Sequence, residues 1–503
     1  MSRTKPTHCL NVRPHGSTEP WVGTLFPAII LWIVFVSVPN FALSLPACLA
    51  LCVPGDTPET SSDSPAQMAP GVRVKPREET FLEEIGRVEP PAVTFLETYV
   101  LTDRTAVLVK HPDGKVEGVV VEIGAKTLEN LIASYRHALD VDAARGVKTV
   151  SPIPDPSAIA PAETSSEREI ARQIYRLLIN PVNRLLPQNP RETVVIVPHD
   201  SLWLLPFAAL RDENDRFFGD QHVLTYAMSE ETWKRVATRP RSADHRNASA
   251  WVVGNPDMSQ AVAGCGTTYT LAPLSGAEQE AKAIAELFGR DKANLFIGPQ
   301  ADRLRLDAWH PDFSVLHFAT HGLACPSDPL SSFIVLKELR QGDLNLDPRS
   351  KTLSLRTDSR FSVALVDPFS SMLGEPLRSP EIREMSIPSD GRGPSFPGPV
   401  ELSYPGLLDA RTIIGQFNLN ADLVTLSACQ TGLGQLSVEG MIGFTRAFLA
   451  AGSRSLMVSL WRVDDRATKD LMVRFYRDYL GHGNKGLAFQ RAMAETRKQI
   501  PGT

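Results

Sequence analysis

Short apolar runs alternate with stretches of helical period along most of the chain after residue 190. The runs are rich in Val, Ile and Leu and too short for helices, so we interpret them as strands. They cover 194–197, 250–253, 314–319, 423–427 and 456–460, and helical spacing covers 276–288, 441–450 and 470–479. Apolar strands that alternate with helices predict an α/β fold with a mostly parallel sheet flanked by helices.

The composition excludes several classes of protein. Apolar residues make up 43% of the 503 residues and charged residues 22%, as in globular proteins. The net charge is only -5, and no Lys/Arg-rich block is interleaved with aromatic residues, so we expect no nucleic-acid partner. The six cysteines are sparse and irregularly spaced. They predict no disulfide framework, and the folded part is compatible with a reducing compartment.

The N-terminal region, 1–53, contains one long uncharged segment. Residues 21–53 include no Asp, Glu, Lys, Arg or His, and about 20 mostly apolar residues suffice for a membrane-spanning helix. We expect a single span at about 21–43. Basic residues before it and acidic residues after it predict a folded part on the non-cytoplasmic side. A cleaved signal peptide of a secreted protein, a lipoprotein signal at Cys48, or a wrongly assigned start codon are the alternatives.

The rest of the chain divides at changes in composition. Residues 54–77 are rich in Pro, Ser, Thr and Asp and indicate a disordered linker. Strand patterns around a Pro-Asp-Gly turn and one helix predict a small α+β part at 78–150. The main domain follows at 162–503, and its first helix opens with a capping box that starts at Thr164. A low-complexity insertion at about 337–403 interrupts it and indicates a functional flap or a disordered segment.

Two of the predicted strands each lead into a reactive side chain and a turn of small residues. His321 follows the strand at 314–319, and Cys429 follows the strand at 423–427. Ligands of open parallel sheets bind beyond the carboxyl ends of the strands, so both side chains should lie at one edge. A histidine there can take the thiol proton and later protonate a leaving amine. Gly322 can offer its backbone N–H to an oxyanion hole. The pattern predicts a cysteine–histidine pair, and therefore a hydrolase of the peptidase kind.

These residues also allow other interpretations. Cys429 alone could be a small buried hydrophobe, and its pairing with His321 favours the nucleophile. His317 lies within the strand, and we interpret it as a hydrogen-bonded core histidine. His317, His321 and Cys325 have the i, i+4, i+8 spacing that would hold a metal ion on a helix. The local sequence is rich in strand formers, and Gly322 opposes a helix, so we expect no metal and no cofactor.

Several motifs resemble those of the CHAT family, caspase-like domains often joined to TPR repeats. The resemblance extends over most of the chain from about 93 to 494. The segments that carry it are 95–99, 197–200, 204–210, 273–281, 317–322, 426–432, 440–452 and 459–465.

The resemblance implies a caspase- or separase-like cysteine endopeptidase fold. It implies that His321 is the general base, that Cys429 is the nucleophile, and that the backbone amides of Gly322 and Cys429 form the oxyanion hole. In the related separases an aspartate shortly after a Trp on the next strand binds a basic P1 side chain. Asp465, with Asp464 beside it, is the best match here, and a carboxylate at that place could pair with Arg or Lys. The alternative is that this residue caps the following helix.

This chain departs from the family pattern in three ways. Val438-Glu439-Gly440 replaces Gly-Glu-Gly, the insertion at 337–403 separates the two catalytic motifs, and TPR repeats are absent from the sequence. We therefore expect an endopeptidase that cleaves a protein or peptide after a basic residue, with a protein activator as a further partner. A non-catalytic, membrane-tethered interaction module is the main alternative, and an acyltransferase or esterase with the same dyad is a third.

Overall fold

The computed structural model describes most of the chain from residue 91 to residue 499. The described residues are 34–35, 91–145, 166–238, 244–258, 261–308, 313–323, 325, 328–347, 349–350, 352–364, 403–427, 438–459 and 465–499. The predicted linker at 54–77 and most of the predicted membrane span at 21–43 lie outside them. Within the described part of the chain, no helix combines the length and apolarity that crossing a bilayer requires.

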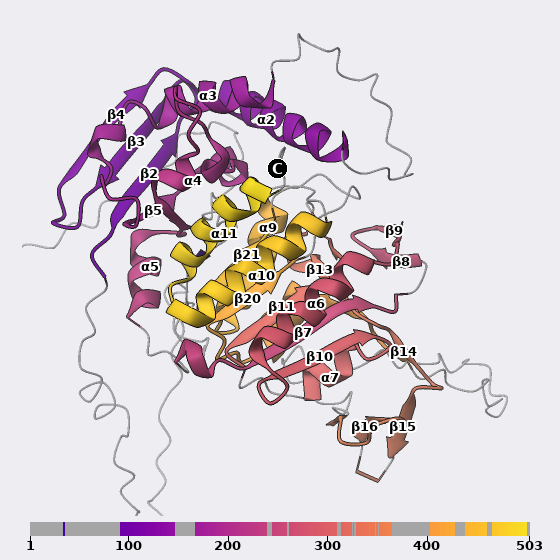
Figure 1. Cartoon of the computed structure of the whole chain (residues 1–503). Helices are drawn as coiled ribbons and strands as arrows, with labels where there is room; N and C mark the ends of the chain where they lie inside the picture. The colour runs from indigo at the N-terminus through magenta and orange to yellow at the C-terminus, as the bar shows by residue number, and fades with distance from the viewer. Residues whose placement is uncertain are drawn as a thin grey trace, which may run out of the picture.

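One 11-stranded sheet organises the molecule (Figure 1). Its strands run in the order β10-β7-β11-β20-β21-β1-β6-β5-β2-β3-β4. Their bounds are β1 (Val34–Phe35), β2 (Thr94–Val100), β3 (Thr105–Lys110), β4 (Val116–Val121), β5 (Thr193–Val197), β6 (Val223–Tyr226), β7 (Ala250–Pro256), β10 (Ala293–Gly298), β11 (Val315–Ala319), β20 (Leu423–Leu426) and β21 (Ser455–Val458).

The strands β10, β7, β11, β20 and β21 form a continuous parallel half. All residues of β11, β20 and β21 are buried. Strands buried on both faces need helices on both sides, which is why their sequences are uniformly apolar instead of alternating. The predicted α/β fold with a mostly parallel sheet is confirmed.

Helices cover both faces of this parallel half. Strand side chains point alternately to opposite faces. His317 of β11 meets Tyr476 of α10, whereas its neighbour Phe318 meets Phe448 of α9, so α10 and α9 lie on opposite faces. In Figure 1, α6 and α11 accompany α10. The helices are α2 (Ala125–Arg145), α3 (Glu167–Leu178), α4 (Phe218–Gln221), α5 (Glu230–Ala237), α6 (Ser275–Phe288), α7 (Arg303–Ala308), α8 (Ala410–Gln416), α9 (Val438–Ala450), α10 (Asp465–His482) and α11 (Lys485–Gln499).

The strands expected in the small α+β part extend the same sheet. β2 pairs with β5 in parallel, and β3 and β4 continue as an antiparallel meander. The capping box of α3 is formed by Ser166 and Glu169, two residues later than predicted. Both registers satisfy the sequence pattern, since Thr164 and Glu167 have the same spacing as Ser166 and Glu169.

Strand β1 lies between the two halves of the sheet. It pairs with β21 in antiparallel and with β6 in parallel orientation. Its two residues, Val34 and Phe35, belong to the segment predicted to span a membrane, and the structure places them in a strand. A β-branched and an aromatic residue are both common in strands.

The insertion predicted at 337–403 is partly folded. It contains β14 (Leu339–Arg340), β15 (Leu344–Asp347), β16 (Thr352–Leu355) and β17 (Ser362–Ala364), and β14 pairs with β18 (Ser403–Tyr404). Alternating apolar residues such as Leu353 and Leu355 face a small separate core, which accounts for these strands. Residues 365–402 lie outside the described part.

Two small antiparallel units lie beyond the carboxyl end of β11. The first is a sheet of β12 (Gly322–Leu323), β13 (Phe333–Val335) and β19 (Leu407–Asp409). The second is the hairpin of β8 (Ala261–Gly264) and β9 (Thr267–Thr270). They pack against each other through a satellite core, whose buried residues are Val262, Tyr269, Leu271, Leu323, Cys325, Phe333 and Val335.

Candidate active site

The histidine and cysteine motifs leave the sheet from neighbouring strands. β11 and β20 are parallel, with Phe318 opposite Leu426. His321 therefore lies three residues past the paired position on its strand, and Cys429 lies three residues past it on the other. Cys429 is outside the described residues, which reach Ser427 on this side. The strands that carry the two motifs thus end side by side, as the sequence predicted.

His321 is nearly buried and its ring is held by the backbone. Its side chain is only 5% exposed, and Nε2 lies 2.8 Å from the carbonyl oxygen of Ala272. A carbonyl oxygen only accepts hydrogen bonds, so Nε2 carries the hydrogen in this contact. In the neutral ring Nδ1 is then the nitrogen that can accept a proton. This is the tautomer that a general base acting through Nδ1 requires.

The backbone around His321 is fixed on both sides. The Thr320 hydroxyl donates to the Val335 carbonyl at 2.6 Å, and the Val335 N–H donates to the His321 carbonyl at 2.9 Å. His321 and Val335 are thus a hydrogen-bonded pair of the antiparallel ladder. The next pair, Gly322 and Ile334, is a non-hydrogen-bonded pair. In such a pair the N–H groups point away from the partner strand. The Gly322 N–H therefore points away from β13, the orientation that an oxyanion-hole donor needs.

His317 belongs to a buried network on the α6 and α10 side of the sheet. It is fully buried, and its Nδ1 lies 3.2 Å from the hydroxyl of Tyr476. That hydroxyl is 2.7 Å from Thr425 Oγ1, and burial raises the pKa of Tyr476 far above its usual value. Nε2 lies 3.0 Å from Glu280 Oε1, without the alignment of a hydrogen bond. The interpretation of His317 as a core histidine is confirmed.

The three residues with i, i+4, i+8 spacing do not share a helix face. His317 is within β11, His321 follows it, and Cys325 follows β12. Cys325 is bonded to Cys265 in a disulfide. The sequence predicted no disulfide framework, and it did not indicate this single pair, because folding brings together two cysteines that are 60 residues apart.

Two further residues near the site were not recognised from the sequence. Ala272 supplies the acceptor for His321, and Asn255 Oδ1 accepts a hydrogen bond of 2.7 Å from the Leu274 N–H. Asn255 is the last but one residue of β7 and has a φ of 44°, a left-handed conformation that Asn tolerates better than most residues. The Gly254-Asn255-Pro256 strand end was the available sequence signal for this anchor.

Of the two aspartates expected to bind a basic side chain, the structure describes only the backbone of Asp465. α10 begins at Asp465, so that residue lies in its first turn; its side chain and Asp464 are outside the described part. β21 runs parallel to β20, so the segment that leads to α10 leaves the sheet at the same edge as the histidine and cysteine motifs. The N-terminal end of a helix also favours negative charge.

Comparisons with known proteins place this architecture in a family. The chain is similar to tetratricopeptide repeat protein 28 from Homo sapiens, with 27% identity over 365 residues. It is also similar to the protein of the same name from Mus musculus, with 26% identity over 368 residues. Each alignment covers 70% of this chain and 13% of the relative's own length. The CHAT domain profile matches residues 168–501, which include both motifs and the described strands and helices from β5 onward. The chain belongs to the CHAT domain family, whose fold is that of caspase-like peptidases.

Proposed function

We propose that this chain is a cysteine endopeptidase in which His321 is the general base and Cys429 the nucleophile. The observation that carries the proposal is the parallel register of β11 and β20, with Phe318 opposite Leu426. Neighbouring strands lie about 4.8 Å apart. Cys429 is two residues beyond Ser427, so its Cα can lie at most about 7 Å from that of Ser427. This reach allows the thiol to approach the imidazole of His321.

The chemistry follows from these groups. Nδ1 of His321 takes the thiol proton of Cys429, and the thiolate attacks the scissile carbonyl carbon. The negative oxygen of the tetrahedral intermediate accepts hydrogen bonds from the N–H groups of Gly322 and Cys429. The imidazolium then protonates the leaving amine as the peptide C–N bond breaks. Water, deprotonated by the same histidine, hydrolyses the thioester and restores the thiol.

We further propose that the substrate is cut after Arg or Lys. Asp465, in the first turn of α10, supports this specificity because β21 brings that turn to the edge of the sheet where β11 and β20 end. A carboxylate of Asp465 or Asp464 there would pair with a cationic P1 side chain. Asp465→Asn should raise KM for Arg and Lys substrates and leave a neutral P1 substrate unaffected.

The same fold could instead serve as a non-catalytic interaction module. The relatives are named for tetratricopeptide repeats, which favours a role in protein–protein interaction for this family. Such a module would need a partner but no thiolate. Peptide cleavage therefore separates the two functions.

The decisive assay uses the full-length chain and a peptide library with varied P1 residues. Wild type should cleave after Arg or Lys. Cys429→Ala should be inactive, and His321→Ala should lose about 10²–10⁴-fold in kcat/KM. His482→Ala is the matched control, since His482 is exposed at the end of α10. No cleavage and no labelling of Cys429 by a thiol-reactive peptide probe would refute the peptidase, and cleavage by Cys429→Ala would refute the nucleophile.

We also propose that the domain lies on the non-cytoplasmic side of a membrane. The Cys265–Cys325 disulfide supports this location, because disulfides form in oxidising compartments. Reporter fusions after Ser61 test it. A signal from the cytoplasmic side would overturn the proposed orientation.

A further inference from the structure

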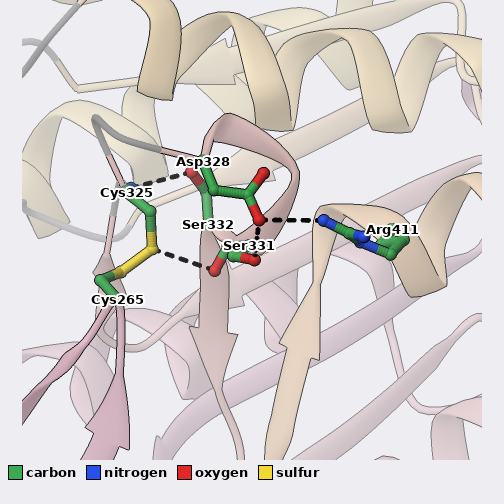
Figure 2. Close-up of a disulfide and its surroundings, with 6 residues drawn as sticks. All are labelled: Cys265, Cys325, Asp328, Ser331, Ser332 and Arg411. Carbon is green, nitrogen blue, oxygen red and sulfur yellow. Dashed lines mark hydrogen bonds and ion pairs between the residues drawn. A yellow bond between two sulfur atoms is a disulfide. The ribbon is translucent and has the colours of Figure 1, made fainter.

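The Cys265–Cys325 disulfide joins a hairpin to the segment that follows His321 (Figure 2). Cys265 lies in the turn between β8 and β9, and Cys325 comes two residues after β12. Their Cα atoms are 5.3 Å apart, within the usual range for a disulfide. Cys325 is fully buried and Cys265 is partly exposed. Of the two cysteines, Cys265 is therefore the more accessible to a small thiol.

The same hairpin supplies the group that orients His321. β9 ends at Thr270, and two residues later the Ala272 carbonyl accepts the hydrogen bond from Nε2. The hairpin is held to the domain through the satellite core defined above and through the disulfide. Small clusters of this kind are where local opening occurs most readily. If the hairpin moves, Ala272 moves with it, and the hydrogen bond that orients the His321 ring is altered.

Cys265 adopts a backbone conformation that cysteine does not favour. Its φ is 50°, and that of the next residue, Gly266, is 75°. Two consecutive left-handed residues form the tight hairpin turn that Asn, Asp and Gly prefer. A residue held in such a conformation points to a use for its side chain. Here the side chain forms the crosslink.

The Cys325 end of the disulfide is fixed to a rigid frame. The Cys325 N–H donates to Ser332 Oγ at 3.0 Å, and Ser331 Oγ donates to Asp328, which pairs with Arg411 of α8 at 2.9 Å (Figure 2). The Cys325 sulfur lies 3.1 Å from the Ser331 carbonyl oxygen, an acceptor for the S–H of the reduced form. Loss of the disulfide would thus loosen the hairpin, which keeps only its satellite core, and leave Cys325 in place.

We propose that the Cys265–Cys325 disulfide is a redox-controlled tether that positions His321 for catalysis. This inference rests on the proposed peptidase function. In reduction, a small thiolate such as glutathione attacks the Cys265 sulfur, the S–S bond breaks, and Cys325 leaves as a thiolate that takes a proton. A second small thiol resolves the mixed disulfide and releases a small disulfide and the Cys265 thiol. The reverse reaction uses a small disulfide as oxidant, which accepts the two electrons and two protons.

Reduction should lower activity by displacing the acceptor of His321. A misplacement of a catalytic group by about 1 Å can cost about 10²-fold in rate. The hairpin stays attached through its satellite core, so we expect a fall in kcat of about tenfold with little change in KM. Amides at 268–275 should exchange their hydrogens faster in the reduced form.

The experiment follows the full-length chain across glutathione buffers of defined thiol-to-disulfide ratio. Mass spectrometry of alkylated peptides reports the state of Cys265 and Cys325, and a basic-P1 peptide reports kcat. The control is a double variant, Cys265→Gly with Cys325→Ser, because Gly suits the left-handed turn and the hairpin keeps its fold. It should show the low kcat of reduced wild type in every buffer.

The outcomes separate this inference from the proposed function. Equal kcat and equal exchange at 268–275 in oxidised wild type and in the double variant would overturn the tether. Equal redox dependence in both proteins would also overturn it, since the effect would then belong to Cys429. If no form cleaves peptides, yet exchange at 268–275 and chemical modification of His321 respond to the disulfide, the tether stands and the peptidase proposal fails.

Discussion

At the scale of single residues, the position of His321 depends on a short chain of backbone contacts. Nε2 binds the Ala272 carbonyl, and Asn255 holds the neighbouring Leu274 N–H. Neither Ala272 nor Asn255 has chemistry of its own in the proposed reaction. They act by fixing the tautomer and the orientation of the ring, as supporting groups around catalytic histidines do.

Asn255→Gly tests this positioning role. Gly keeps the left-handed backbone but removes the hydrogen bond to Leu274, so kcat should fall several-fold while KM changes little. The free energy of unfolding should fall by about 1 kcal/mol. Steady-state kinetics and urea unfolding measure both effects. Asn255→Asp keeps the acceptor for the Leu274 N–H but replaces the donor to Glu278 with a carboxylate, so it should restore kcat only in part. Equal kcat in wild type and Asn255→Gly would show that the hydrogen bond to Leu274 does not position His321.

Tyr476→Phe tests the expectation that the His317 network stabilises the fold and takes no part in catalysis. The variant deletes the hydroxyl between His317 and Thr425, leaving both without that partner inside the protein. The free energy of unfolding should fall by about 1–3 kcal/mol. kcat/KM should be unchanged, because this network lies within the sheet and away from its carboxyl edge. A large loss of kcat/KM in a folded Tyr476→Phe protein would give His317 a catalytic role.

At the scale of elements, a buried charge cluster ties the last strands to the last helices. Asp422, just before β20, lies 2.8 Å from Lys485 of α11 and 3.2 Å from Arg454, and accepts a 2.8 Å hydrogen bond from Tyr479 of α10. Burial alone would raise the pKa of Asp422. Lys485, Tyr479 and Arg454 outweigh it and lower that pKa from 3.8 to about 2.

This cluster predicts a specific pH dependence of stability. A folded-state pKa below the unfolded one stabilises the protein above the unfolded pKa, and the stabilisation is lost as pH falls through the folded pKa. Asp422 should therefore contribute about 2 kcal/mol above pH ~4, lost progressively towards pH ~2. Urea unfolding at several pH values should show this slope in wild type and not in Asp422→Asn. Asp478→Asn, at a partly exposed pair, is the control and should change stability by less than about 1 kcal/mol.

The sequence predicted the strands whose apolar runs match their burial in the folded protein. β11 and β20 are buried on both faces, so their apolar runs identified them and the carboxyl edge where their motifs lie. The hairpin of β8 and β9 could not be predicted in this way. Its strands contain only four residues each, and its turn places Cys265 where Asn or Gly is usual. The partner of Cys265 depends on tertiary structure alone.

Glu280 is a second residue whose partner could not be predicted from the sequence. It stands among the charged residues of α6 in the sequence, but only 3% of it is exposed, and it faces His317. Its spacing from Ala277 and Ile284 places it on the apolar side of the helix. This spacing could have predicted that Glu280 is buried. The histidine that it faces, on a strand 37 positions away in sequence (317 − 280), could not be read from the pattern.

At the scale of the whole molecule, the part before the family region completes the sheet. The CHAT match begins at residue 168, yet β2 pairs with β5 along Thr94 to Glu97, and Tyr135 of α2 is fully buried and donates to the Ala209 carbonyl. Lys110 of β3 also pairs with Glu230 of α5 at 2.6 Å. Residues 91–145 therefore fold with the CHAT region and not apart from it.

Truncation tests this integration. A chain that begins at residue 162 lacks Tyr135 and would expose the edge of β5 and the core against which Tyr135 packs. It should therefore unfold at a lower urea concentration than the full-length protein, or fail to remain soluble. A chain that begins at residue 78 loses β1, which pairs with β21 and β6, but keeps β2, β3 and β4, so it should be more stable than the chain that begins at residue 162. Equal urea midpoints for the 162 and 78 chains would contradict the account.

The most direct test of the central claim is the pH dependence of Cys429 alkylation. The rate of modification by iodoacetamide, followed by mass spectrometry of the Cys429 peptide, reports the thiolate fraction. A Cys–His pair predicts rapid alkylation well below pH 8.5, the pKa of an ordinary cysteine, and loss of this low-pH reactivity in His321→Ala. Identical pH profiles in wild type and His321→Ala, both rising near pH 8.5, would contradict the pairing on which the proposed function rests.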